Sequence, residues 1–126
     1  MYLAHTALFA SELERTRDFF TTYFNCAAGP LYHNKSTGFR SYFLTFPDGG
    51  RLELMDMPGI AQPDTARRRG LDHIAIDVGG RQQVDALTAR LTGDGYVLLS
   101  PPRTTGDGYY ESCVAGPDGL RIEITG

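Results

Sequence analysis

Two stretches of this 126-residue chain return later in the sequence in nearly the same form. The peptide PDGGRLEL at residues 47–54 returns as PDGLRIEI at residues 117–124, and LAHTAL at residues 3–8 returns as LDHIAI at residues 71–76. The offsets are 70 (117 minus 47) and 68 (71 minus 3), so the two halves share one register. A doubled unit of this length is too short for a solenoid, which needs three or more copies. The repeat therefore predicts two like modules that pair to close one core.

Each half carries one histidine near its start and one glutamate near its end: His5 and Glu53, then His73 and Glu123. A lone histidine or glutamate in a strand is usually a surface residue. Two matched pairs with similar internal intervals change that interpretation, because a pseudo-two-fold axis between the halves would bring all four together. Two imidazoles and two carboxylates form a suitable ligand set for a divalent metal.

The order of expected elements is the same in both halves. In the first, Ser11 and Glu14 form a capping box, and Leu13, Phe20 and Phe24 recur at helical spacing. Alternating apolar residues between turn signals indicate the strands. The expected elements of the first half are a strand over 2–9, a helix over 11–25, and strands over 31–34, 39–46 and 51–56. Those of the second are a strand over 71–78, a helix over 81–93, and strands over 96–100, 109–115 and 120–125.

These elements predict an α+β protein of two βαβββ modules. We expect a single domain over 1–126, with module one at 1–57, a linker at 58–70 and module two at 71–126. Large aliphatic residues flank Glu53 and Glu123, so each glutamate should point away from the face that packs on the helix.

Composition excludes several classes of function. The net charge is −3 and no long lysine or arginine run occurs, which argues against binding to nucleic acid; the one basic cluster, residues 67–69, is interpreted as solvated linker. No apolar run approaches the ~18 residues of a membrane span. The N-terminus lacks the pattern of a secretory signal, so we expect a cytoplasmic protein. Two cysteines, Cys26 and Cys113, make no disulfide framework and are interpreted as structural.

The paired histidines and glutamates, the His-x-Ala strand starts and the Pro-Asp-Gly turns resemble the vicinal oxygen chelate superfamily over the whole chain. This group includes glyoxalase I, extradiol dioxygenases, fosfomycin-resistance proteins, methylmalonyl-CoA epimerase and bleomycin-binding proteins. The resemblance implies sheets that curl around a metal cleft, a small-molecule substrate and a homodimer, in which the site lies within one chain or across the subunit interface.

The ligand set resembles that of glyoxalase I, which has His, Glu, His and Glu where this chain has His5, Glu53, His73 and Glu123. The dioxygenases and fosfomycin-resistance proteins have no carboxylate ligand at the position of Glu53. The resemblance implies a lyase or isomerase that moves a proton through an enediolate, with Glu123 as the principal base and Glu53 as its partner. The reaction needs no redox change, so Zn²⁺ or Ni²⁺ fits as the single divalent ion.

The substrate-binding positions depart from that pattern. Bacterial glyoxalase I places a glutathione-binding arginine and asparagine where this chain has Phe9 and Met57, so we expect glutathione to be a poor co-substrate. The remaining candidates for substrate contact are Arg40, Tyr42, Arg103 and Tyr110. The loop over 104–110 is either a mobile lid or a plain hairpin connection.

Three classes of function remain open. The first is a glyoxalase I-type enzyme acting on the thiol hemithioacetal of an α-oxoaldehyde. The second is an oxygen-using enzyme, which would need Fe²⁺ with open coordination positions that a fourth protein ligand would crowd. The third is a protein that sequesters a small molecule and so confers resistance.

Overall fold

The computed structural model describes residues 1–62, 66 and 69–126. It divides into two compact units, residues 1–63 and 64–126, which are described separately. The predicted linker over 58–70 and basic cluster over 67–69 include residues 63–65 and 67–68, which lie outside the described residues, so both interpretations stay predictions.

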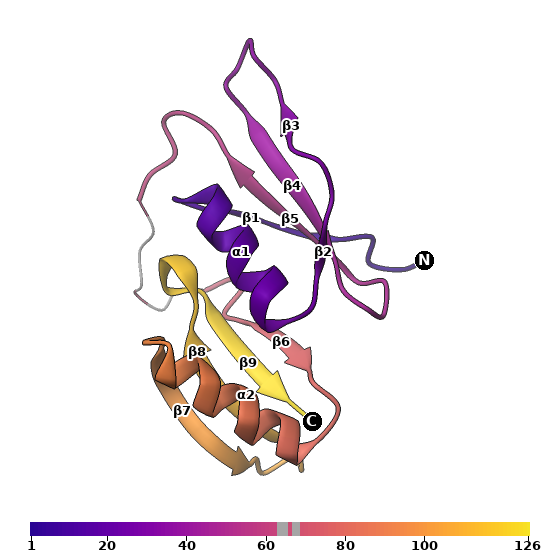
Figure 1. The fold of residues 1–126 in the computed structure, drawn as a ribbon, viewed down its shortest axis with the longest axis vertical. Helices are drawn as coiled ribbons and strands as arrows, with labels where there is room; N and C mark the ends of the chain where they lie inside the picture. The colour runs from indigo at the N-terminus through magenta and orange to yellow at the C-terminus, as the bar shows by residue number, and fades with distance from the viewer. Residues whose placement is uncertain (63–65, 67–68) are drawn as a thin grey trace. The chain divides into compact units, whose positions relative to one another are not determined.

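The first unit is a mixed sheet with one helix (Figure 1). The strands lie in the order β1-β5-β4-β2, with β3 also paired to β4; β1 is parallel to β5, and the other pairs are antiparallel. Its elements are β1 (Thr6–Phe9), α1 (Leu13–Tyr23), β2 (Ala27–Ala28), β3 (Tyr32–His33), β4 (Arg40–Thr45) and β5 (Arg51–Asp56).

The second unit repeats this plan. Its strand order is β6-β9-β8-β7, again with one parallel pair, β6 and β9, and two antiparallel pairs. Its elements are β6 (Ile74–Asp77), α2 (Arg81–Gly93), β7 (Val97–Thr104), β8 (Tyr110–Ala115), the 3₁₀ turn η1 (Pro117–Gly119) and β9 (Arg121–Thr125). The α+β fold of two βαβββ modules is confirmed, with one sheet in each module.

Prolines interrupt the same edge of both sheets. In the first unit Gly29 and Pro30 separate β2 from β3, and in the second the register of β7 shifts around Pro101 and Pro102. Proline has no N–H to donate to a strand ladder, so it is tolerated at a sheet edge and marks an irregular one. The two-residue strand β2 was not predicted, because alanine has a weak strand preference.

The cores lie between each helix and one face of its sheet. Phe20, Leu44 and Leu54 are almost completely buried in the first unit, as are Ile122 and Ile124 in the second. Removing such aliphatic and aromatic side chains from water is the main favourable term in folding. The same apolar face directs the intervening glutamates away from the helix.

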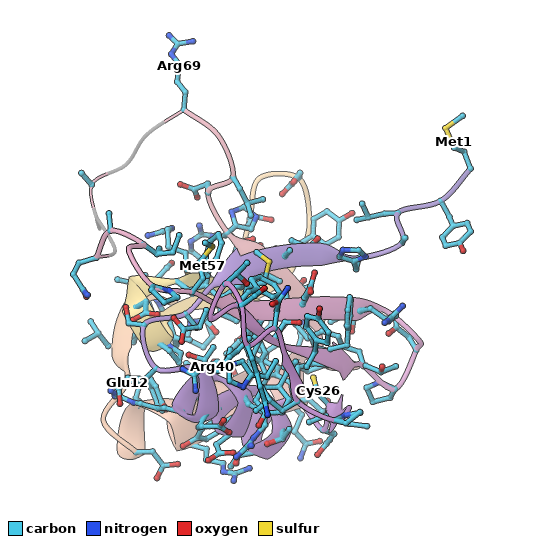
Figure 2. The ribbon with its side chains drawn as sticks, turned by 90° about the horizontal axis from the view of Figure 1, so that it is seen from above. Met1, Glu12, Cys26, Arg40, Met57 and Arg69 are labelled. Carbon is cyan, nitrogen blue, oxygen red and sulfur yellow. The ribbon has the colours of Figure 1, made fainter. Side chains whose placement is uncertain are left out.

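Several predicted boundaries are wrong. The strand expected over 96–100 continues as β7 to Thr104, and the helix expected to reach 25 ends at Tyr23. The strands expected over 2–9 and 71–78 begin only at Thr6 and Ile74, because their pairing with β5 and β9 starts there. Figure 2 shows Met1 at the end of an extended N-terminal segment. Helix α1 begins at Leu13 with Glu12 at its N-cap, two residues after the predicted start at Ser11, and the Glu12 side chain makes no capping hydrogen bond. In the part of the chain that the structure describes, both helices are too short and too polar to cross a membrane.

Candidate metal centre

His5 and Glu53 form a pair in the first unit. His5 directly precedes β1, and the parallel register sets Ala7 opposite Glu53, so alternation directs both side chains to the face away from α1. The His5 Nε2 atom lies 3.7 Å from Glu53 Oε2, and the side chains are 38% and 17% exposed. The pair is thus accessible to a small ion or ligand.

His73 and Glu123 form the equivalent pair in the second unit. Ala75 lies opposite Glu123 in the parallel register of β6 and β9, as Ala7 lies opposite Glu53. The His73 Nε2 atom is 3.1 Å from Glu123 Oε2, with side chains 37% and 20% exposed. The repeated sequence thus produces the same pair at the same register twice.

The two histidines are supported differently. His73 Nδ1 lies 3.2 Å from Asp72 Oδ2, and that oxygen is 3.4 Å from Arg121 Nε. A carboxylate on the second ring nitrogen fixes the orientation and tautomer of a histidine ligand.

His5 instead packs edge-on against Phe43, with ring centroids 5.2 Å apart, and the guanidinium of Arg51 lies 4.1 Å from the centroid of the Phe43 ring. One imidazole is therefore supported by a charge and the other by an aromatic ring.

The donor set fits a divalent transition metal. Neutral imidazole nitrogen and carboxylate oxygen are ligands of Zn²⁺ and related ions. Each unit places one histidine beside one glutamate, both partly exposed, on the face of its own sheet that points away from the helix. Among the residues that the structure describes, no group of three or more His, Cys, Asp or Glu side chains that could hold a metal forms.

Three of the predicted substrate-contact residues lie on the sheet faces that carry these pairs or directly beside the strands of the pairs. Phe9 ends β1 opposite Met55 and is 42% exposed, on the face of Glu53. Met57 directly follows β5 and is half-buried. Arg103 lies opposite Glu111 on the face of Glu123 and is paired with it, Nη1 to Oε1 3.4 Å.

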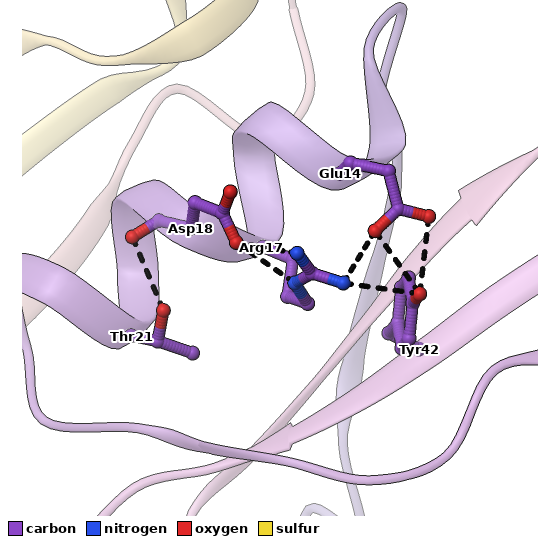
Figure 3. Close-up of polar contacts among 5 residues, drawn as sticks. All are labelled: Glu14, Arg17, Asp18, Thr21 and Tyr42. Carbon is purple, nitrogen blue, oxygen red and sulfur yellow. Dashed lines mark hydrogen bonds and ion pairs between the residues drawn. The ribbon is translucent and has the colours of Figure 1, made fainter.

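Arg40 and Tyr42 lie on the helix side of the first sheet. The Tyr42 hydroxyl is 3.0 Å from both carboxylate oxygens of Glu14 and 3.1 Å from Arg17 Nη1, both on α1 (Figure 3). Arg40 pairs with Asp56 across β4 and β5, and this hydrogen bond raises the pKa of Arg40. Both residues face away from Glu53 and take part in helix packing and strand pairing, and their contact with a substrate stays a prediction.

Tyr110 and the loop before it belong to the second unit's hairpin. The Tyr110 hydroxyl donates to Asp85 Oδ1 on α2 at 2.8 Å, which raises the pKa of Tyr110, and Arg81 lies over its ring. Thr105 donates its N–H to the Tyr109 carbonyl at 2.8 Å and closes a short turn between paired strands. The loop over 104–110 joins two paired strands as a hairpin in this conformation, and Tyr110 faces α2 instead of Glu123.

Both cysteines are free and buried, on strand or strand-flanking positions of the two sheets. Burial raises the pKa of Cys26 to about 11 and also raises the pKa of Cys113, which lies opposite Glu123. A protonated, inaccessible thiol is a poor nucleophile and a poor ligand. These environments agree with structural roles.

Sequence reasoning did not single out Phe43, Arg51 or Asp72. The repeat held a signal for two of them. Arg51 and Arg121 both stand two residues before a paired glutamate, and the residue before the paired histidine is Ala4 in one half but Asp72 in the other. No local pattern relates Phe43 to His5, since their contact depends on strand pairing.

Comparison of the chain with protein-family models identifies a match over residues 2–124. The matching model is the Glyoxalase/Bleomycin resistance protein/Dioxygenase superfamily. No curated protein matches the chain in sequence.

Solved structures of similar fold cover nearly the whole chain. A glyoxylase/bleomycin resistance protein/dioxygenase domain from Frankia sp. EAN1pec has a TM-score of 0.83 at 19% identity, over 99% of this chain and 96% of that one. A glyoxalase I mutant from Zea mays has a TM-score of 0.81 at 20% identity, over 98% of this chain but 43% of that one.

The fosfomycin resistance protein FosX from Listeria monocytogenes, solved with Mn(II) and sulfate, has a TM-score of 0.73 at 20% identity, over 98% of this chain and 90% of that one. At these identities the likeness shows the fold alone, and the family model carries the assignment. The two βαβββ modules and the match over residues 2–124 show that the chain belongs to the Glyoxalase/Bleomycin resistance protein/Dioxygenase superfamily.

Proposed function

We propose that this protein is a metal-dependent lyase or isomerase of glyoxalase I type. Its substrate would be the hemithioacetal that an α-oxoaldehyde forms with a thiol. The carrying observation is the repeated pair: each unit sets one imidazole nitrogen beside one carboxylate oxygen, at 3.7 Å and 3.1 Å, on the face away from the helix. His5, Glu53, His73 and Glu123 would together hold one divalent ion, with Zn²⁺ or Ni²⁺ favoured by the donor set.

The two glutamates would move the proton. When bound, a divalent ion stabilises the negative charge that develops on two neighbouring oxygens of an enediolate. Glu123 is the proposed base that takes the proton from one carbon and returns it to the next, and Glu53 is its near-symmetric partner. A carboxylate serves this purpose because it can accept a proton at neutral pH and release it again. Partial exposure of both carboxylates leaves room for a substrate beside them.

The surroundings of Glu53 favour a less charged adduct than that of glutathione. Phe9 and Met55 lie side by side on the face of Glu53, and Met57 follows on the chain. Apolar side chains supply no donor for a carboxylate, whereas arginine forks and amides do. The two free cysteines suit a reducing compartment, which supports our expectation of a cytoplasmic enzyme.

Metal analysis of His73→Ala tests the proposed ligands. Loss of one imidazole should abolish tight metal binding, because no neighbouring group can replace it. His33→Ala is the matched control, since His33 lies on β3 and is exposed. Full metal occupancy in His73→Ala would overturn the ligand assignment.

An assay of the metal-loaded protein with methylglyoxal and several thiols tests the reaction. Disappearance of the hemithioacetal without O₂ uptake supports the proposal, whereas O₂ consumption would identify an oxygenase. Sedimentation analysis would test the homodimer that we also propose, and a monomer that retains full activity would contradict it.

A small-molecule binding or resistance protein is the second candidate. The apolar neighbours of Glu53 that argue against glutathione would suit such a ligand equally well. Tight binding of a ligand without turnover would select this alternative.

A further inference from the structure

Arg51 and Arg121 occupy equivalent places in the two sequence repeats but have different partners. Arg121 Nε lies 3.4 Å from Asp72 Oδ2. The residue that corresponds to Asp72 in the first unit is Ala4, 68 positions earlier (72 minus 4), so the equivalent carboxylate is missing. The guanidinium of Arg51 lies instead over the Phe43 ring, 4.1 Å from its centroid.

Strand register places Arg51 beside the His5 and Glu53 pair. Arg51 and Glu53 are two residues apart on β5 and therefore share a face. Phe43 lies directly opposite Glu53 on β4 and packs against the His5 ring. Arg51 thus lies over the Phe43 ring, and that ring contacts His5 edge-on beside the proposed metal ligands.

The stacked guanidinium retains its hydrogen-bond donors. A cation–π contact uses the charge of a guanidinium and none of its N–H donors, so these remain able to bind a carboxylate in bidentate geometry. Thr45 lies directly opposite Arg51 on β4 and is exposed, so its hydroxyl is a neighbouring donor. Three described arginines lie on the faces of Glu53 and Glu123. Arg103 and Arg121 form ion pairs with carboxylates, whereas Arg51 contacts an aromatic ring.

We propose that Arg51, with Thr45 beside it and Phe43 beneath it, is a carboxylate-binding subsite for the substrate. The inference rests on the proposed function, because it takes the His5 and Glu53 pair as the end where the substrate reacts. Residues two apart on a strand are separated by about 7 Å, so the carboxylate lies about that far from the reacting oxygens. The substrate class is an acyclic adduct with one carboxylate at that distance, as in the hemithioacetal of 3-mercaptopropionate.

A single carboxylate subsite distinguishes this class from glutathione. Glutathione has two carboxylates, whereas Arg51 is the one arginine on the face of Glu53 among the described residues, and no acid pairs with it there. Arg40 would otherwise be the second candidate in this unit, but it is held by Asp56 on the helix side. The subsite therefore suits a thiol acid smaller than glutathione.

An NMR titration with a matched pair of inert thioethers tests the subsite. The probes are 3-(methylthio)propanoate and 3-(methylthio)propanamide, which differ only in charge at the end that Arg51 would bind. We expect the wild-type protein to prefer the acid, and Arg51→Gln to weaken binding of the acid by about tenfold or more while binding of the amide stays the same. Arg15→Gln is the control for net charge, because Arg15 is an exposed residue of α1 paired with Glu12.

Two results would overturn the inference. One is an equal affinity of the wild-type protein for the two probes. The other is an Arg51→Gln variant that loses affinity for both probes alike, or for neither. Phe43→Leu adds a second check, because removal of the ring should weaken binding of the acid but not of the amide, even though Arg51 keeps its charge.

Metal content and turnover separate this inference from the proposed function. If the protein takes up no metal and turns over no hemithioacetal, but Arg51→Gln still removes the preference for the acid, the subsite stands and the glyoxalase proposal fails. If the metal-loaded protein is active and Arg51→Gln leaves both the probe affinities and KM for the 3-mercaptopropionate adduct unchanged, the glyoxalase proposal stands and the subsite fails.

Discussion

Glu53 and Glu123 occupy the same place in their units, but the histidines beside them contact different partners. His73 is held by Asp72, whereas His5 rests on Phe43. Glu123→Gln should lower the proposed activity by several orders of magnitude and metal content much less, because an amide can offer an oxygen but cannot accept a proton at neutral pH. Turnover and elemental analysis measure the two quantities, with Glu12→Gln on the exposed end of α1 as control. Parallel losses would make Glu123 a ligand alone.

Asp72 is expected to affect metal binding through its contact with His73. Asp72→Asn removes the charge beside His73 Nδ1 and should weaken metal binding by about 10- to 100-fold, the usual cost of losing a carboxylate behind a ligand histidine. Competition with a chelator measures the affinity. Asp77→Asn on β6 is the control, since an amide oxygen can still accept from Gly79 N as Asp77 does. Equal affinity in wild type and Asp72→Asn would show that Asp72 does not support His73.

At the scale of elements, Tyr42 fastens α1 to β4. Tyr42→Phe removes the hydroxyl that bonds to Glu14 and Arg17 and should lower the free energy of unfolding by about 1 to 2 kcal/mol. Denaturant unfolding measures the loss, and Tyr109→Phe is the control because Tyr109 is 62% exposed. Metal content and KM should not change. A raised KM with unchanged stability would show that Tyr42 contacts the substrate instead.

The buried position of Cys26, which follows α1, limits the reactivity of its thiol. With its pKa raised to about 11 by burial, Cys26 has only about one thiolate in a thousand at pH 8. Iodoacetamide should therefore modify neither Cys26 nor Cys113 in the folded protein at pH 8 over minutes, and both in denaturant. Because the pKa of Cys26 in the folded protein lies above the ordinary value of about 9.0 for a cysteine thiol, thiolate formation favours the unfolded chain as pH rises from about 9 to 11. Rapid labelling of the folded protein at pH 8 would contradict this account.

At the scale of the whole molecule, we expect the proposed enzyme to differ from an ordinary glyoxalase I in its thiol co-substrate. Phe9 and Met57 replace two polar anchors, and two lost charge-assisted contacts amount to roughly 3 to 6 kcal/mol. We therefore expect kcat/KM with methylglyoxal and glutathione to fall well below the ~10⁶ M⁻¹s⁻¹ order of an efficient enzyme. Steady-state kinetics at saturating metal measures it. A value near that order would make the protein a glutathione-dependent glyoxalase I.

The repeated peptides and the alternation of apolar residues predicted the module order, the strands β4, β5, β8 and β9 to within a residue or two, and the outward direction of Glu53 and Glu123. These features follow from local periodicity, because alternation along a strand decides which side chains share a face. Helix α2 was predicted residue by residue, since an apolar face at helical spacing carries its own signal.

The tertiary structure alone decided which charged side chains are engaged. The sequence does not distinguish the three arginines Arg40, Arg51 and Arg121, which all stand on strands. In the structure Arg40 pairs with Asp56 and Arg121 with Asp72, whereas Arg51 lies over the Phe43 ring. Tyr42 and Tyr110 likewise face helices instead of the carboxylates. Cross-strand and helix–sheet contacts join residues far apart in the chain, so no local pattern encodes them, and the strand register that creates them exists only in the folded units.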